Sequence, residues 1–217
     1  MAWAGKDALV KLAGAASSFD SAATTSADDR VYQLASTTYQ GMPFAPNASI
    51  VVKTSSGGTY ASTTYTLNRL NGSVIFATSA ARGAATVTGS YIPMNTAARA
   101  REYNVSISGS NADTSVFGSE WTAREQTQLD ITGSVGAFFS SQHSTQVGEA
   151  LTSTARMPTA IEVYHVSTAA FAMRFWALLA GDSLDASPDA MIESGIEFEG
   201  TADADDRVVT FSTASSS

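Results

Sequence analysis

Residues 103–139 read YNVSISGSNADTSVFGSEWTAREQTQLDITGSVGAFF, with two alternating runs on either side of a polar, turn-rich centre. In the first run the apolar residues Tyr103, Val105 and Ile107 alternate with polar ones, and in the second run Leu129 begins the same alternation. A half-buried β-strand requires this period of two, because successive side chains point to opposite faces of a sheet. We therefore predict that the stretch forms two neighbouring strands.

Shorter strands are predicted along the rest of the chain, separated by segments that contain Gly, Pro, Ser and Asn. In the run YTLNRLNGSVIFAT, Asn71 and Gly72 can adopt the positive φ values of a type I′ turn, which predicts a hairpin. One short α-helix is expected near residues 141–154, where apolar residues recur at helical spacing after a serine N-cap. The predicted fold class is therefore mainly β. The other predicted strands are residues 31–34, 49–54, 65–70, 73–78, 85–91, 160–166, 171–179, 191–199 and 208–212.

The pattern divides the chain into three portions. The N-terminal segment is rich in Ala, Ser, Thr and Gly and reads as an extended arm that buries too little to order itself. Its apolar anchors Leu9, Leu12 and Phe19 are expected to pack on a neighbouring subunit. The predicted portions are the arm at 1–30, a β-hairpin-rich portion at 31–98 and a β core at 99–217.

Charge is low and unevenly distributed. Charged residues make up 15% of the chain, and the net charge is −8. Residues 1–102 carry 8 basic and 5 acidic side chains, whereas residues 103–217 carry 4 and 15. An acidic protein repels nucleic acid phosphates, so tight or sequence-specific DNA binding is not expected. A surface of small neutral polar groups suits association, because protein interfaces are depleted in Lys and Glu.

No catalytic, cofactor or metal site is predicted, and the protein is not expected to be an enzyme. The chain has no cysteine, which excludes thiolate chemistry. His143 and His165 have no acidic or hydroxyl partner in a recognisable order, and the GSVG run at residues 133–136 lacks the spacing of a nucleophile elbow. No apolar run approaches the length needed to cross a bilayer, so no membrane anchor is expected.

Three carboxylates alternate with other residues in the run IESGIEFEG, namely Glu193, Glu197 and Glu199. Strand periodicity places them on one face. Like charges along a strand are unfavourable unless their face is hydrated or meets cations. We therefore expect this stripe to face water, in a channel if the protein forms one.

Two longer runs resemble known sequences. NADTSVFGSEWTAREQTQLDITGSVGAFF (111–139) resembles the signature of bacteriophage tail tube (major tail) proteins, which combines a D-T-T-x-F-G loop, an aromatic residue and a strand ending in G-x-x-G-F/Y-F. FWALLAGDSLDASPDAMIESGIEFEGTA (175–202) resembles the closing strands of that family. The upstream runs VYQLA, ASIVVKT, YTLNRLNGSVIF and ATVTGSYIPM are similar to the β-hairpin portion of tail proteins from phages of high-GC Gram-positive hosts. Ser115 and Glu120 depart from the commonest Thr and Asp of the signature.

The resemblance implies a tail-tube-type β-sandwich or barrel that assembles as hexameric rings, stacked into the tube through which genomic DNA is delivered. It implies a virion structural protein, assembled in the host cytoplasm, with the tape measure protein and tail-end proteins as further partners. DNA would pass through an acidic lumen without sequence-specific binding. The candidate subunit contacts are Phe117 and Trp121 in the central loop, and Ser55 and Gly57 in an exposed loop between strands.

Two other functions fit part of the sequence. A capsid decoration or head–tail joining protein is built on similar β domains. A carbohydrate-binding β-sandwich module would use tryptophan side chains as stacking platforms for sugar rings. The tryptophans Trp3, Trp121 and Trp176 are scattered, and Trp176 lies in an apolar strand, which favours core roles.

Overall fold

The predicted mainly β fold is confirmed. The only regular helix among the described residues is a short 3-10 helix at Ser62–Thr64, and none there is long and apolar enough to span a bilayer. The α-helix predicted near 141–154 lies outside the described residues. The computed structural model describes residues 9–26, 30–36, 38–77, 85–96, 100–113, 124–138, 158–164, 173–185, 193–202 and 209–211.

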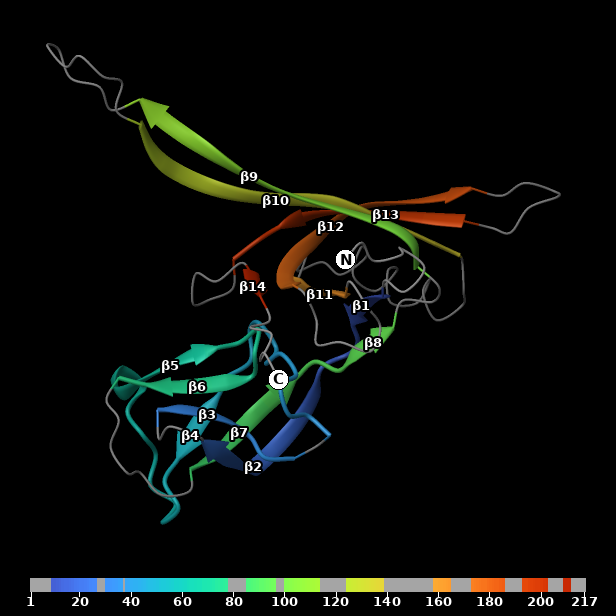
Figure 1. The fold of residues 1–217 in the computed structure, drawn as a ribbon. Helices are drawn as coiled ribbons and strands as arrows, with labels where there is room; N and C mark the ends of the chain where they lie inside the picture. The colour runs from blue at the N-terminus through green and yellow to red at the C-terminus, as the bar shows by residue number, and fades with distance from the viewer. Residues whose placement is uncertain are drawn as a thin grey trace, which may run out of the picture.

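The described strands form two sheets (Figure 1). The larger, eight-stranded sheet contains β1 (Leu9–Ala13), β8 (Met94–Thr96), β9 (Ala100–Asp113), β10 (Arg124–Phe138), β11 (Thr159–Tyr164), β12 (Met173–Asp185), β13 (Glu193–Gly200) and β14 (Val209–Phe211). Its order is β8-β1-β11-β12-β13-β10-β9, and β14 pairs with the start of β12. The six-stranded sheet contains β2 (Ser17–Ser26), β3 (Val31–Leu34), β4 (Val51–Lys53), β5 (Tyr65–Asn68), β6 (Ser73–Phe76) and β7 (Thr86–Tyr91). Its order is β4-β7-β2-β3-β6-β5.

The larger sheet curls on itself through β12. The first half of β12 pairs with β11 and the second half with β13, and the ladder with β13 shifts between Leu179 and Gly181. A bulge of this kind bends the strand and increases its twist. The sheet therefore has two layers (Figure 1). The upper layer consists of β9, β10, β13 and the second half of β12, and the lower layer of β8, β1, β11 and the first half of β12.

Apolar side chains fill the space between the two layers. Phe198 of the upper layer packs on Phe175 of the lower layer, with ring centroids 5.3 Å apart. Gly133 makes room for this packing, because a Cβ atom there would lie 2.5 Å from the Phe198 ring and 2.1 Å from the carbonyl oxygen of Asn104. The buried members of this core are Val10, Leu12, Ile131, Val135, Ile161, Val163, Phe175, Ala177, Ile196 and Phe198.

The six-stranded sheet is an insertion in the larger one, and we call β2 to β7 with their connections the inserted unit. Strands β1 and β8 are neighbours in the larger sheet, with Ala13 opposite Met94, and the inserted unit lies between them in sequence. The Gly14 N–H donates to the Pro93 carbonyl at 2.8 Å. The chain therefore leaves and rejoins the larger sheet at nearly the same point. The core of the inserted unit is rich in aromatic rings, including Phe19, Tyr32, Phe44 and Phe76.

The expectation of an extended arm is wrong for residues 9–26. Strand β1 pairs with β8 and β11, and β2 pairs with β3 and β7. Leu12 is buried in the core of the larger sheet, Phe19 is buried in the inserted unit, and Leu9 lies half-buried opposite Tyr164. These strands have few large side chains, and their partners on both sides supply the packing that their own composition does not.

The hairpin at Asn71 and Gly72 is present, but its turn is wider than predicted. Pairing between β5 and β6 ends with Asn68 opposite Ser73. Gly72 has a φ of 57°, whereas Asn71 is outside the left-handed region, so the turn is not type I′. The ladder ends early because Leu70 points into the contact with the larger sheet, where it is fully buried.

Replacing Gly72 by alanine is expected to destabilise the fold far more than the same change at Gly57. The φ values are 57° and 88°, and left-handed backbone costs a residue with a Cβ about 1–2 kcal/mol. A Cβ on Gly72 would also lie 2.1 Å from the Met42 carbonyl oxygen, whereas nothing lies within 4 Å of one on Gly57. Urea denaturation of both variants measures the difference. Equal losses would contradict the structure of this turn.

An apolar patch joins the inserted unit to the lower layer. Trp176 and Ala160 of the lower layer pack on Leu70 and Ile92 of the inserted unit, and all four side chains are buried. On β11 and β12, Ala160 and Trp176 alternate with the residues of the interlayer core. Within the lower layer, β11 and the first half of β12 are therefore buried on both faces.

A buried ion pair lies beside this patch. Arg174 on β12 pairs with Glu162 on β11 through two of its nitrogens. The same guanidinium donates across the junction to the carbonyl oxygens of Gly41, at 2.8 Å, and Leu70. The Tyr164 O–H donates to Glu162 at 2.8 Å. Burial lowers the pKa of Arg174 and Glu162 opposes that shift, but a guanidinium keeps its charge in proteins.

The free energy of unfolding is expected to fall as the pH rises above about 10, in part through Tyr164. Burial, and the neighbouring Glu162 charge, raise the pKa of Tyr164 above its ordinary value of 10.0. The unfolded chain therefore loses this proton first, and alkaline pH favours unfolding. Burial also raises the pKa of Tyr65 and Tyr103, so Tyr164→Phe should flatten the pH profile only partly. Urea titrations between neutral pH and pH 11 test this, and an unchanged slope in Tyr164→Phe would refute it.

Candidate assembly surface

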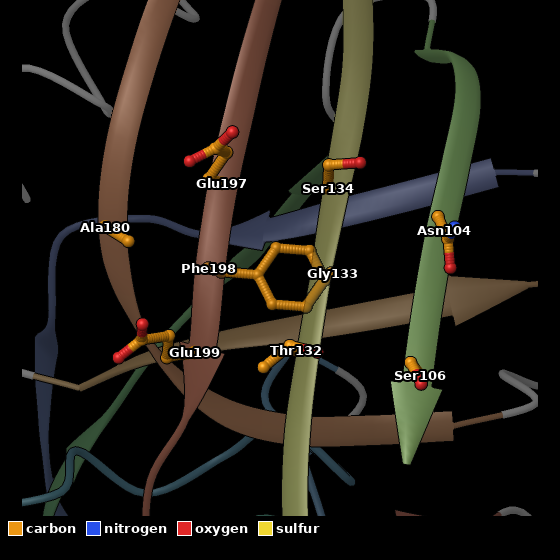
Figure 2. Close-up of a pocket in the computed structure, with 9 residues that line it drawn as sticks. All are labelled: Asn104, Ser106, Thr132, Gly133, Ser134, Ala180, Glu197, Phe198 and Glu199. Atoms are coloured by element: carbon orange, nitrogen blue, oxygen red, sulfur yellow. The ribbon is translucent and has the colours of Figure 1, made fainter. Parts of the chain in front are cut away.

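The upper layer has a polar face on the side away from the core (Figure 2). Strand alternation separates this face from the buried one, and the register aligns its side chains across strands. Ser134 on β10, for example, lies opposite Glu197 on β13 and Asn104 on β9. The exposed side chains of the polar face include Glu102, Asn104, Ser106, Ser108, Asp130, Thr132, Ser134, Glu197 and Glu199.

The middle of the polar face is a shallow hollow of about 380 Å³. Gly133 and Phe198 lie at its base, and carboxylate, hydroxyl and amide groups surround them (Figure 2). None of its lining residues is a histidine, lysine or arginine. Across the described segments, no group of three His, Cys, Asp or Glu side chains is arranged to hold a metal ion. The hollow offers hydrogen-bonding groups and negative charge.

Among the described side chains, four carboxylates give the polar face its charge. Glu197 and Glu199 lie on β13, Asp130 on β10 and Glu102 on β9, and all four are exposed. Within the described residues of this face there is no lysine or arginine to neutralise them. Neutral hydroxyl side chains lie directly opposite the two β13 carboxylates, which avoids the cross-strand contact of like charges that destabilises sheets. The face is thus hydrated, negative and suited to repelling a polyanion.

Among the described strands, the upper layer has an open edge on each side. Strand β9 is the last strand of the sheet, and no described strand pairs with its outer side. On the other side, β11 pairs with β12 only from Met173 to Ala177. The second half of β12 therefore pairs only with β13 among the described strands. Long open edges favour pairing with another chain.

Two large apolar side chains are exposed on the core side of the β9–β10 ribbon. Ile107 is 44% exposed and Leu129 is 57% exposed, and they are the large hydrophobic side chains that stand out as exposed in the described part of the chain. Both lie where the ribbon extends beyond β13, whose pairing with β10 begins at Thr132. No described residue of the lower layer buries Ile107 or Leu129 fully at this end of the ribbon.

Comparisons with solved structures give partial likenesses, including the following two. The first is to the tail of an empty gene transfer agent (GTA) particle, computed with helical refinement and C6 symmetry, at 10% identity over 55% of this chain and 87% of that chain, with a TM-score of 0.44. The second is to the virion of a native GTA particle, at 10% identity over 55% of this chain and 89% of that chain, with a TM-score of 0.45. No protein-family profile and no curated protein sequence matches the chain.

The structure brings part of the predicted carboxylate stripe together. Glu197 and Glu199 are exposed side by side on the polar face (Figure 2), whereas the side chain of Glu193 lies outside those that the structure describes. The sequence alone did not identify Asp130 and Glu102 as members of this face, because only the strand register brings them beside β13. That register follows from pairing the two alternating runs.

The other predicted contact residues are dispersed. Ser55 and Gly57 are exposed in the loop after β4, and their role stays a prediction. Phe117 and Trp121 lie outside the described residues, so their role in assembly also stays a prediction. Trp176 is fully buried and cannot be a stacking platform for a sugar.

Proposed function

We propose that this protein is the subunit of a bacteriophage tail tube, a virion structural protein without enzymatic activity. The observation that carries the proposal is a sheet layer with one acidic, hydrated face and two open edges. The motif resemblance at residues 111–139 and 175–202 supports the same assignment. A layer of this kind is suited to forming the wall of a channel from repeated copies.

The directions of the strands allow the layer to continue from copy to copy. Successive antiparallel pairings of β12 with β13, β13 with β10 and β10 with β9 make β9 run opposite to β12. Placing β9 of one copy beside the second half of β12 of the next therefore continues the antiparallel alternation. Such head-to-tail contacts repeat until a ring closes, and closure pairs the backbone groups at both edges. We propose six copies per ring, with the rings stacked into a tube.

The polar face would line the inside of this ring. The other face of the upper layer is covered by the lower layer, so the acidic face is the one available to a channel. Glu102, Asp130, Glu197 and Glu199 would then repeat around the lumen. A negative, hydrated wall repels phosphates, so DNA can move along it without being held.

The remaining partners follow from the same assignment. The tube would assemble from subunits in the host cytoplasm, around or beside a tape measure protein, and would join tail-end proteins at its ends. The loop that contains Phe117 and Trp121 is proposed to contact a neighbouring subunit. Loss of assembly in Phe117→Ala and Trp121→Ala would support that contact.

Electron microscopy of the negatively stained, concentrated protein tests the proposed function. Hollow tubes or rings with a central channel are expected, with large particles in light scattering. A protein that stays monomeric at every concentration would count against a tube. Compact oligomers without a channel would favour a capsid decoration or head–tail joining role instead.

Replacing both Glu197 and Glu199 by lysine is expected to leave assembly intact and to make the tubes retain DNA. Exposed substitutions of this kind change the free energy of unfolding by about 0.5 kcal/mol or less. Lysines on a channel wall would bind phosphates and release counterions, so retention should weaken steeply with salt. The matched Glu197→Gln, Glu199→Gln variant removes the negative charge without adding positive charge. If the lysine tubes retain no more DNA than the glutamine tubes in a low-salt cosedimentation assay, these residues do not face the lumen.

A further inference from the structure

We propose that the inserted unit forms the outer surface of the tube, on the far side of each subunit from the channel wall. This inference rests on the proposed function, because it takes the polar face as the lumen wall. An experiment can still distinguish failure of the outer placement of the inserted unit from failure of the proposed function.

The first step is that β11 and β12 have two differently occupied faces. Ile161 and Phe175 point into the interlayer core beneath β13. The alternating neighbours Ala160 and Trp176 point the other way and pack on the inserted unit. The lower layer therefore separates the inserted unit from the upper layer, as the view in Figure 1 shows.

The second step is that several contacts fix this arrangement. Trp176 has no exposed surface, so the apolar contact with the inserted unit is closed to water. Arg174 links the ion pair of the lower layer to the carbonyl oxygens of Gly41 and Leu70. The two chain connections lie together at Gly14 and Pro93. The inserted unit is thus held against the lower layer at several points, in one orientation.

The order of parts across the subunit follows from these contacts. It runs from the acidic face through the upper layer, the interlayer core and the lower layer to the inserted unit. If the acidic face lines the channel, the inserted unit lies at the largest radius. The loop after β4, in which Ser55 to Gly58 are all exposed, then faces the surroundings of the tube. This placement replaces the subunit contact that the sequence suggested for that loop.

Single-cysteine labelling tests the order of parts, because the native chain has no cysteine and each variant carries one thiol. Ser55→Cys places it in the exposed loop of the inserted unit, and Ser134→Cys places it in the hollow of the polar face. Each variant is treated with a maleimide on a long polyethylene glycol, both as assembled tubes and as dissociated subunits. A gel shift measures the fraction labelled.

We expect Ser55→Cys to be labelled equally in tubes and subunits, and Ser134→Cys to lose its labelling on assembly. Loss of labelling at both positions would overturn the outer placement of the inserted unit and leave the acidic lumen standing. Labelling of Ser134→Cys in assembled tubes would overturn the proposed function, because the polar face would then not line the lumen. Failure of both variants and of the native chain to form tubes would also overturn it. If only one variant fails to assemble, Thr132→Cys or Gly58→Cys replaces it on the same surface.

Discussion

Subunits that carry aspartate at both Ile107 and Leu129 are expected to fold normally and to form no tubes. Ile107 is 44% and Leu129 57% exposed in the single subunit, so replacing them costs the fold less than replacing a buried core residue would. In the proposed ring, the ribbon that bears them extends past its own lower layer and lies against the next copy. Burying an Ile or Leu side chain contributes about 1.5–3 kcal/mol, and each 1.4 kcal/mol changes an association constant by about tenfold.

Because about half of each side chain is still exposed in the single subunit, the loss per contact is on the order of tenfold to a hundredfold, before the cost of burying two carboxylates is counted. Sedimentation and electron microscopy measure tube formation, and circular dichroism with thermal unfolding measures the fold. The matched control is aspartate at Asn104 and Ser106, which adds the same charge to the polar face of β9, opposite the neutral Ser134 and Thr132. Tubes from the Ile107, Leu129 variant would show that this end of the ribbon does not contact a neighbour. If neither this variant nor the control forms tubes, the added negative charge rather than a lost contact prevents assembly.

Replacing Arg174 by methionine is expected to cause the largest loss of subunit stability. The change removes the partner of the buried Glu162 and the donor to the carbonyl oxygens of Gly41 and Leu70. Breaking a buried ion pair by removing one partner costs about 3–5 kcal/mol, because the remaining charge stays buried and unpaired. For a chain of this size each 1 kcal/mol lowers Tm by about 2–4 °C, so the shift in Tm should be on the order of 10 °C.

The double variant Arg174→Met, Glu162→Leu tests the stated cause of that loss. It removes the unpaired charge together with its partner, and apolar replacement of a buried pair is often close to neutral. The double variant should therefore recover much of the stability that the single variant loses. If the double variant is as unstable as Arg174→Met alone, the loss comes from the contacts with Gly41 and Leu70 rather than from Glu162.

Much of the fold could be predicted from the alternating pattern. The strand at residues 31–34 coincides with β3, and the pair of runs at 103–139 corresponds to β9 and β10 in register. Alternation is a local property, so sequence shows it directly. Alternation also shows which residues of a strand share a face, so the exposure of Glu197 and Glu199 on β13 could be predicted for the same reason.

The arrangement of the two sheets could not be predicted in this way. Strand β1 has only Val10 and Leu12 as buried side chains, and the reason that it forms is the pairing with β8 and β11 far along the chain. The same non-local pairing makes the smaller sheet an insertion. The early end of the pairing between β5 and β6 could not be predicted for a comparable reason, since Leu70 packs on Trp176, which lies on a distant strand.

The Arg174 and Glu162 pair was also hidden in the sequence. Each residue lies in an apolar run, where a single charge commonly faces water at a sheet surface. Only the adjacent positions of β11 and β12 bring the two together, and only the inserted unit covers them. The candidate contact at Ile107 and Leu129 was hidden for the opposite reason, because alternation predicts the core face of a strand but not where the covering layer ends.

A cryo-electron microscopy reconstruction of the assembled protein tests the central claim most directly. The account predicts a hollow tube in which β9 of each subunit lies beside the second half of β12 of its neighbour, with Glu197 and Glu199 on the channel wall. A channel lined by the inserted unit, or neighbours joined through other surfaces with β9 left open to solvent, would contradict it.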